Sequence, residues 1–279
     1  MNPNEPSRTA LMIARQRAAH QLLDQGAIFS DPFAIKILCE DEKDVLQFAT
    51  AHPFAGIGRL FTAARSRIAQ DALSAAVERG IRQIVILGAG LDTFALRNPH
   101  GAPGIRIYEV DHPATQAWKI QRLAEARLAL PPWLIFVPVD FERDDLAQEL
   151  AGAGFQQNTP AFFTWLGVTP YLTQDAIGST LDYIASVPRS EVVFDYMEPA
   201  EAFSEELRQL ENARDQQLKK MNERSVSRFD PAAMAAILRS HGFSRGEDID
   251  FQKIVSRFGR AVLGLASGHL GAHVVHAKH

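Results

Sequence analysis

The stretch VILGAGLDTFALR, residues 85–97, is an apolar run that ends at two glycines one residue apart, Gly88 and Gly90. A strand that ends in such a turn usually brings its backbone close to a ligand. Glycine turns of this kind serve several cofactors. The occupant could be a dinucleotide pyrophosphate, a nucleoside without phosphates, or nothing at all.

Strands and helices alternate on the C-terminal side of this stretch. Apolar runs predict five strands, at residues 82–90, 104–111, 133–141, 160–168 and 190–197. Helical patterns separate them at residues 113–130, 144–155 and 173–187. Such alternation predicts an α/β fold, with a parallel sheet covered on both faces. These sheets bind ligands at the carboxyl ends of their strands, where the strand order reverses.

The segments outside this core are predicted to be mostly helical. Helices are expected at residues 7–29, 30–38, 62–79 and 230–243, and a last strand at 272–279. Residues 199–228 are charged and helical, with an imperfect apolar stripe formed by Phe203, Leu207, Leu210, Leu218 and Met221. We expect a single domain, residues 1–279, with N-terminal helices (1–80), a cofactor-binding core (81–198), a helical lid or insert (199–240) and C-terminal strands that complete the sheet (241–279).

The composition is that of a soluble globular protein. The chain has 279 residues, of which 46% are hydrophobic, and a net charge of −4, which argues against a nucleic-acid partner. The single cysteine, Cys39, excludes an intrachain disulfide and is expected to be an inert core residue. Because no signal peptide and no membrane-spanning run is recognised, we expect a cytoplasmic protein without a membrane partner. The oligomeric state stays open.

The residues after the glycine turn favour one cofactor class. A dinucleotide site would show G-x-G-x-x-G, but the third position here is Thr93, preceded by Asp92. An acid beside a helix N-terminus repels a pyrophosphate but suits a ligand with an ammonium and a sulfonium group. The turn therefore favours S-adenosyl-L-methionine over NAD, and an NAD-dependent oxidoreductase remains the alternative from another class.

Acidic residues also follow the next two strands. Glu109 and Asp111 lie about twenty residues beyond the turn, where a carboxylate can accept both ribose hydroxyls. Asp140 could accept from an adenine amino group, and Phe141 would give the ring an apolar neighbour. Acids at successive strand ends predict a nucleoside site, although hydroxyls and an amino group do not distinguish the two cofactors.

Several of these motifs resemble the leucine carboxyl methyltransferase family. The motifs are ARSR (64–67), VILGAGLDTFALR (85–97), YEVDHP (108–113), PVDF (138–141) and GVTPYLT (167–173). The family also contains polyketide carboxyl O-methyltransferases of the tetracenomycin type, and the similarity runs from about residue 8 to the C-terminus. It implies a Rossmann-like class I methyltransferase sheet, mostly parallel with an antiparallel C-terminal strand.

The resemblance also implies roles for individual residues. Arg65 would contact the methionine carboxylate of S-adenosyl-L-methionine and Gly88 its methionine backbone. Asp111, rather than Glu109, would take the ribose, while Asp140 and Phe141 would hold the adenine. One position departs from the family, because Leu166 stands where many members have a glutamate in strand four. Either a neighbour such as Glu109 binds the amino end instead, or the affinity is lower.

The acceptor side of the site is less defined. A carboxylate acceptor needs no general base, whereas a phenol or alcohol would profit from one, and no base can be assigned. Tyr171 and Tyr196 follow strands four and five and could line the acceptor pocket or pack as aromatic residues. His112 is expected to be structural or solvated.

We therefore expect an S-adenosyl-L-methionine-dependent O-methyltransferase acting on a carboxyl, or a hydroxyl, of a small molecule. A protein C-terminal leucine is the alternative acceptor, and a degenerate protein that binds the cofactor without turnover is the alternative to an enzyme. The histidines of the tail, His269, His273, His276 and His279, could ligate zinc on a helix. Val274 and Val275 favour a strand, on which His273 and His276 point to opposite faces, so no metal is expected.

Overall fold

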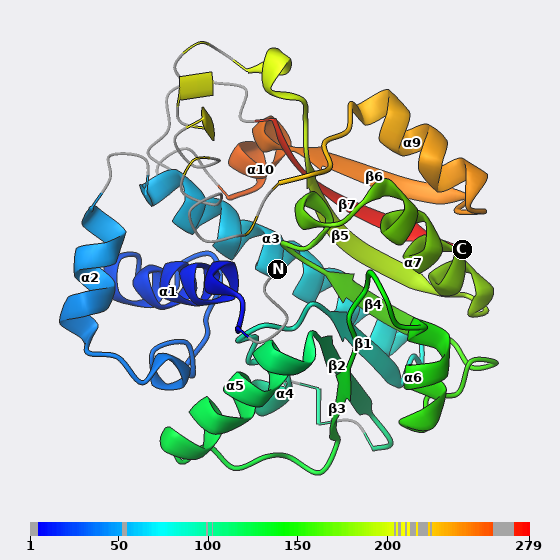
Figure 1. Ribbon diagram of the computed structural model, residues 1–279, viewed down its shortest axis with the longest axis horizontal. Coiled ribbons are helices and arrows are strands. Elements are labelled where there is room, and N and C mark those ends of the chain that lie inside the picture. Colours follow the sequence, from blue (N-terminus) through cyan, green and yellow to red (C-terminus); the bar gives the residue numbers. More distant parts are fainter. Residues whose placement is uncertain are drawn as a thin grey trace.

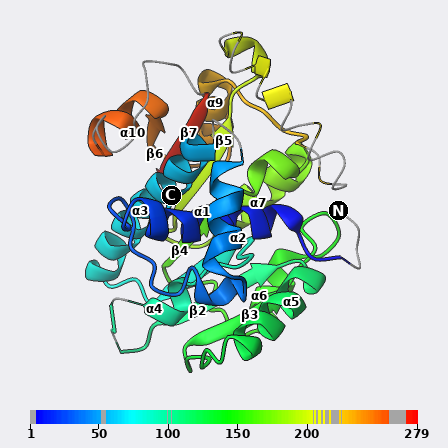
Figure 2. The same ribbon diagram turned by 90° about the vertical axis from the view of Figure 1, so that its left-hand side faces the viewer.

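The computed structural model describes residues 5–51, 55–98, 100–101, 103–203, 225–258 and 271–279, together with residues 205, 208, 209, 211, 212, 216 and 223. The chain opens with three helices, α1 (Arg8–Leu23), α2 (Glu42–Thr50) and α3 (Ala55–Glu78), and a short 3-10 helix η1 (Lys36–Leu38). Helix α1 packs against both α2 and α3, and Figure 2 shows α1 and α2 together on the side that faces the viewer.

A seven-stranded sheet forms the centre of the molecule (Figure 1). Its strands are β1 (Gln83–Leu87), β2 (Arg106–Asp111), β3 (Leu134–Pro138), β4 (Ala161–Trp165), β5 (Glu191–Met197), β6 (Arg245–Asp250) and β7 (Ala272–Lys278). They are ordered β3-β2-β1-β4-β5-β7-β6. Strands β1 to β5 are parallel, whereas β7 runs antiparallel to both β5 and β6. The predicted α/β class, mostly parallel with an antiparallel C-terminal strand, is confirmed.

Helices follow most of the strands. They are α4 (Phe94–Arg97), α5 (Pro113–Glu125), α6 (Leu146–Gly152), η2 (Thr169–Tyr171), α7 (Gln174–Ser186), η3 (Ala200–Ala202), α9 (Pro231–Ser240) and α10 (Phe251–Phe258). Side chains cap the N-termini of α6, α7 and α9: Asp145, Thr173 and Asp230 each accept from backbone N–H groups of the first turn. None of the helices in the described segments is long and apolar enough to cross a membrane.

Alternation along the strands divides the core between the two faces of the sheet. Ile84 and Ile86 of β1 belong to a cluster with α3, α4 and α10 on one face. Val85 and Leu87 belong to a second cluster with α6, α7 and α9 on the other. A third cluster joins α1, α2 and η1 to α5. The continuous apolar runs in the sequence reflect this burial on both faces.

The structure differs from the sequence-based expectations at a few elements. Strand β6 and helix α2 were not predicted as separate elements. The β6 sequence, RGEDID, is mostly charged because β6 is an edge strand, where one face and one edge meet solvent. Residues 30–38 form turns and η1 rather than one helix. The prediction that Cys39 is a core residue was wrong, since Cys39 is exposed at the end of η1.

Only part of the expected insert at residues 199–228 can be compared with the prediction. Phe203 is buried, with 4% of its surface exposed. The other predicted apolar positions, Leu207, Leu210, Leu218 and Met221, lie outside the described residues, as does His269. Residues 225–230 run beside the loop after β4, where the Val226 and Ser227 N–H groups both donate to the Pro170 carbonyl.

Candidate functional site

A cavity of about 600 Å³ opens at the carboxyl ends of the parallel strands. Strand β1 lies between β2 and β4 in the sheet. Strands β2 and β3 are added on one side of β1 and the later strands, from β4 on, are added on the other side, so the strand order reverses at β1. This is the crevice where open α/β sheets bind ligands. The cavity is lined by residues that follow β1, β2, β3 and β4, by one side of α1, and by Glu223 and Val226.

The glycine turn after β1 forms the floor of the cavity. Gly88 and Gly90 both adopt left-handed backbone conformations, with φ of +66° and +48°. The Ala89 N–H between them donates to the Val110 carbonyl of β2 at 3.0 Å. The turn thus presents its backbone to the cavity in a conformation that favours glycine.

Asp111 is held against this turn by two backbone hydrogen bonds. Its Oδ2 accepts from the Gly90 N–H at 2.5 Å, and its Oδ1 accepts from the His112 N–H at 2.7 Å. Burial raises the pKa of Asp111, and the two backbone bonds counteract part of that rise. The carboxylate of Asp111 therefore has a fixed orientation on the wall of the cavity.

Asp92 places a second carboxylate at the opposite end of the turn. Its Oδ1 accepts from the Phe94 N–H at 2.6 Å, and its Oδ2 lies 3.5 Å from Arg17 Nη1. Burial by itself raises the pKa of Asp92, but the charges of Arg17 and Arg97 more than offset it, and the pKa is lowered. Asp92 is thus an anion in the cavity wall, as the sequence argument for a cationic ligand requires.

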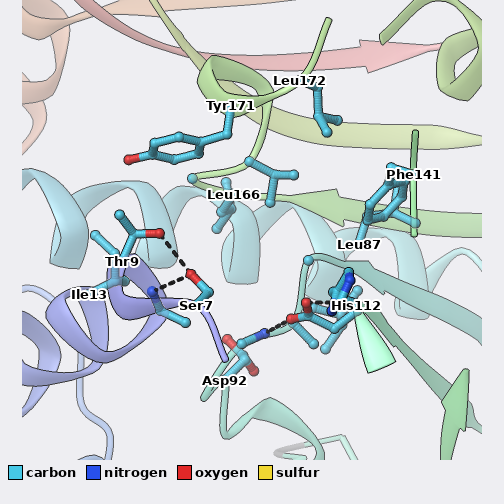
Figure 3. A pocket seen from close by; sticks show the side chains of 18 of the residues that line it. Ser7, Thr9, Ile13, Leu87, Asp92, His112, Phe141, Leu166, Tyr171 and Leu172 are labelled. Carbon is cyan, nitrogen blue, oxygen red and sulfur yellow. Dashed lines mark hydrogen bonds between the residues drawn. The ribbon is translucent and has the colours of Figure 1, made fainter. Parts of the chain in front are cut away.

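The end of β3 supplies the expected pair Asp140 and Phe141. Both line the cavity, and Phe141 also packs against the α6–α7 face of the core. The Oδ1 of Asp140 accepts from the Glu142 N–H at 3.1 Å. His112 caps α5, where its Nδ1 accepts from the Ala114 N–H at 3.3 Å, in agreement with a structural role. Figure 3 shows Phe141 and His112 at one end of the cavity.

Arg65, Leu166 and Tyr171 also line the cavity. Arg65 belongs to α3 and Tyr171 to η2. In Figure 3 Tyr171 lies across the cavity from Ser7, the N-cap of α1, and Thr9 of its first turn, with Leu166 between the two sides. Leu166 therefore lines the cavity at the position where the family resemblance predicts a glutamate.

Two expected site residues do not line the cavity. Glu109 is 1% exposed and pairs with Lys119 Nζ at 2.5 Å, and burial raises its pKa to about 7 despite this ion pair. Tyr196 is 1% exposed and donates to Asp248 Oδ2 at 2.6 Å, while its ring stacks on His273. Glu109 is thus turned into the protein rather than toward a ligand's amino end, and Tyr196 packs between β5 and the C-terminal strands rather than at an acceptor.

Helix α1 forms one wall of the cavity, a contribution that was not predicted from the sequence. Ser7, Thr9, Ile13 and Arg17 line the cavity, and Glu223 accepts from the N–H groups of Arg8 and Thr9 at 2.6 and 3.0 Å. One signal was available, because Arg17 follows Ala14 and Ile13 at helical spacing and so places a charge on a mostly apolar helix face. The position of Glu223 could not be found from sequence, since it depends on a contact between distant segments.

The C-terminal histidines have separate partners. His273 and His276 lie on β7 and face opposite sides of the sheet, as predicted. His273 bridges Asp248 and Glu198, with distances of 2.7 and 2.6 Å, while His276 Nε2 lies 2.9 Å from Glu191 Oε2. In the segments that the structure describes, no group of three or more potential ligands could hold a metal ion.

Comparison with known proteins identifies the family. The model of the family described as leucine carboxyl methyltransferase matches residues 10–185, which is more than half of the chain. The chain belongs to the leucine carboxyl methyltransferase family. A Bacillus subtilis (strain 168) relative, named "Putative S-adenosyl-L-methionine-dependent methyltransferase YktD", is 35% identical over 70% of this chain and 72% of its own length. A Mycolicibacterium smegmatis relative whose name assigns it to the same class is 28% identical over 90% of this chain and 85% of its own. This leucine carboxyl methyltransferase family member is a methyltransferase, and its cofactor is S-adenosyl-L-methionine.

Solved structures agree with the fold. A DUF574 family protein from Streptomyces avermitilis has a TM-score of 0.55 at 16% identity and covers 94% of this chain and 96% of that one. The CurJ carbon methyltransferase has a TM-score of 0.51, also at 16% identity, over 97% of this chain and 66% of that one. The family member therefore shares the Rossmann-like class I methyltransferase architecture.

Proposed function

We propose that this enzyme transfers the methyl group of S-adenosyl-L-methionine to a carboxyl group of a small, largely apolar acid. The cofactor would lie along the strand ends, with adenine at Asp140 and Phe141 and ribose at Asp111. Its methionine half would lie at the turn of Gly88 and Gly90 and at Arg65. The residues fit this ligand, because the turn exposes backbone and Asp111 presents a fixed acceptor toward hydroxyl groups.

Asp92 is the candidate partner for the positive charges of the cofactor. It lines the cavity beside the turn and its pKa is lowered, whereas Glu109 is paired with Lys119 away from the cavity. We therefore propose Asp92, rather than Glu109, for the role that a strand-four glutamate has in many family members.

The state of two glutamates that line the cavity, Glu223 and Glu142, supports a carboxyl acceptor. Glu223 accepts from the N–H groups of Arg8 and Thr9, and Glu142 accepts from the Thr173 N–H at 3.1 Å. Among the described lining residues, these acids are already engaged in holding the fold, which makes them poor candidates for a general base. A carboxylate acceptor needs none, because it is already a nucleophile at neutral pH.

The chemistry then reduces largely to positioning. The bound cofactor supplies an electrophilic methyl group on a sulfonium. A carboxylate oxygen would attack the methyl carbon in line, the carbon–sulfur bond would break with its electron pair staying on sulfur, and no proton would move. The protein's contribution would be to align the two groups and exclude water. Ile13, Leu166, Leu172 and Val226 line the acceptor end and would pack against an apolar acceptor body.

A labelling experiment tests this proposal. Purified enzyme with methyl-tritiated cofactor would be offered small apolar carboxylic acids, matched phenols and alcohols, and a peptide that ends in leucine. Methyl esters release volatile labelled methanol in mild base, whereas methyl ethers do not. We expect base-labile label on a small acid, abolished by Asp111→Ala. Base-stable label on a phenol, or label on the peptide alone, would contradict the proposal.

A further inference from the structure

Arginines of α3 and of the turn that follows it form an ion pair near each end of strand β5. Near its start, Arg79, in the turn that directly follows α3, pairs with Glu191. Near its carboxyl end, Arg65 Nη1 lies 2.6 Å from Asp195 Oδ2, and both side chains are 6% exposed. Arg65 lines the cavity, whereas Asp195 is not one of the lining residues. Asp195 therefore contacts the site through Arg65.

Asp195 also holds the loop after β4. Its Oδ1 accepts from the Gly167 N–H at 2.5 Å, and its main-chain carbonyl accepts from Thr169 Oγ1 at 2.5 Å. Gly167 and Thr169 lead from β4 to Tyr171 on the acceptor side of the cavity. One buried carboxylate thus connects the arginine expected at the cofactor with the wall expected at the acceptor.

The guanidinium of Arg65 has little freedom to choose another orientation. It lies over the Phe61 ring, 5.8 Å from the ring centroid. Gly167 packs against it so closely that an added Cβ would lie 2.8 Å from Nη2. A guanidinium has five N–H donors in one plane. Because Asp195 takes a donor of Nη1, the other donors are held in a fixed direction for a second carboxylate.

We propose that Asp195 is a positioning residue for cofactor binding, which holds Arg65 so that its remaining donors meet the methionine carboxylate of S-adenosyl-L-methionine. This inference rests on the proposed role of Arg65. Without the charge of Asp195, a buried guanidinium would lose its counter-charge and turn toward solvent. The carboxylate of the ligand would then lose its partner, while the adenosine half of the site, formed by other strands, would be unaffected.

Two ligands separate positioning from general damage. S-adenosylhomocysteine carries the amino-acid carboxylate, and 5′-methylthioadenosine has the same adenosine and thioether without it. Calorimetric titration of the purified chain would compare both ligands for wild type and Asp195→Asn. We expect the variant to bind S-adenosylhomocysteine about 10- to 100-fold more weakly, the range for loss of a hydrogen bond to a charged group. Its affinity for 5′-methylthioadenosine should hardly change. Equal losses for both ligands, or no loss for S-adenosylhomocysteine, would overturn the proposal.

Glu191→Gln is a matched control, because it removes a buried carboxylate of the same strand at the end remote from the cavity, where Glu191 pairs with Arg79, His276 and Lys278. It should lower the melting temperature and leave both affinities unchanged. Arg65→Gln should reproduce the ligand-selective loss, and adding Asp195→Asn to it should cause little further loss. Additive effects of these two substitutions would refute a role through Arg65.

Asp195→Glu provides a variant that retains the buried charge and displaces it by one methylene. It should fold and show a smaller loss, again confined to S-adenosylhomocysteine. A loss shared by both ligands in this variant would also refute the proposal. Because these titrations contain no acceptor, a failure of the carboxyl-transfer proposal would leave their outcome untouched, so the two hypotheses fail independently.

Discussion

Replacing Gly88 by alanine tests whether the turn after β1 requires glycine for two separate reasons. The first is conformational, because Gly88 has φ of +66°, which costs an alanine about 1–2 kcal/mol. The second is steric, because an added Cβ would lie 2.2 Å from Val168 Cγ2. Overpacking of this kind costs about 1–3 kcal/mol. The substitution should therefore destabilise the protein by about 2–5 kcal/mol, which lowers Tm by about 4–20 °C in a chain of this size.

Three further variants separate the two causes. Gly104 has φ of +78°, and an added Cβ there would meet no atom within 4 Å, so Gly104→Ala isolates the conformational cost. Its Tm should fall by only about 2–8 °C. Val168→Ala removes the atom in conflict, and the remaining Val168 Cβ would lie 3.4 Å from the new Cβ, an ordinary contact. The double variant Gly88→Ala with Val168→Ala should recover the steric part.

Thermal unfolding and S-adenosylhomocysteine titration of the wild type and the four variants would provide the test. Val168 lines the cavity, so its displacement in Gly88→Ala should weaken ligand binding, and the double variant should regain part of the affinity. If Gly88→Ala costs no more stability than Gly104→Ala, the predicted steric conflict is absent. Strict additivity of the Gly88 and Val168 substitutions would lead to the same conclusion.

Two other substitutions probe contacts that hold the fold around the site. Burial lowers the pKa of His273, but hydrogen bonds with Asp248 and Glu198 more than offset it and the pKa is raised. The stability that the charged form of His273 contributes is therefore complete below about pH 6.5 and declines as the pH rises through its folded-state pKa. The Tm difference between wild type and His273→Gln should accordingly shrink above about pH 6.5. A difference that grows with pH would contradict this sign. Glu223→Ala should destabilise the protein by about 1–2 kcal/mol in urea unfolding, because it removes the acceptor from the N-terminus of α1, whereas Glu201→Ala, an exposed glutamate of the same segment, should have little effect.

The carboxyl ends of β1, β2 and β3 were readable from sequence because each of their functional residues directly follows a buried strand. Strands of a parallel sheet end at one edge, so Gly88, Gly90, Asp111, Asp140 and Phe141 had to come close together, and all of them line the cavity. The same reasoning misplaced Tyr196, because a residue near a strand end can face either side of the sheet. It also misplaced Glu109, two positions before Asp111 in the same strand.

What the sequence by itself determined is the α/β architecture, since burial on both faces of a parallel sheet imposes apolar runs and the turn after β1 requires glycine. It could not assign β6, whose charged residues are tolerated only because the strand lies at an edge, nor the wall formed by α1. Contacts between distant segments decided those features: Arg65 meets Asp195 across 130 positions, and Glu223 meets the first turn of α1 across more than 200. Ion pairs of this kind have no periodicity in the chain, because they depend on which surfaces face each other only after the sheet has formed.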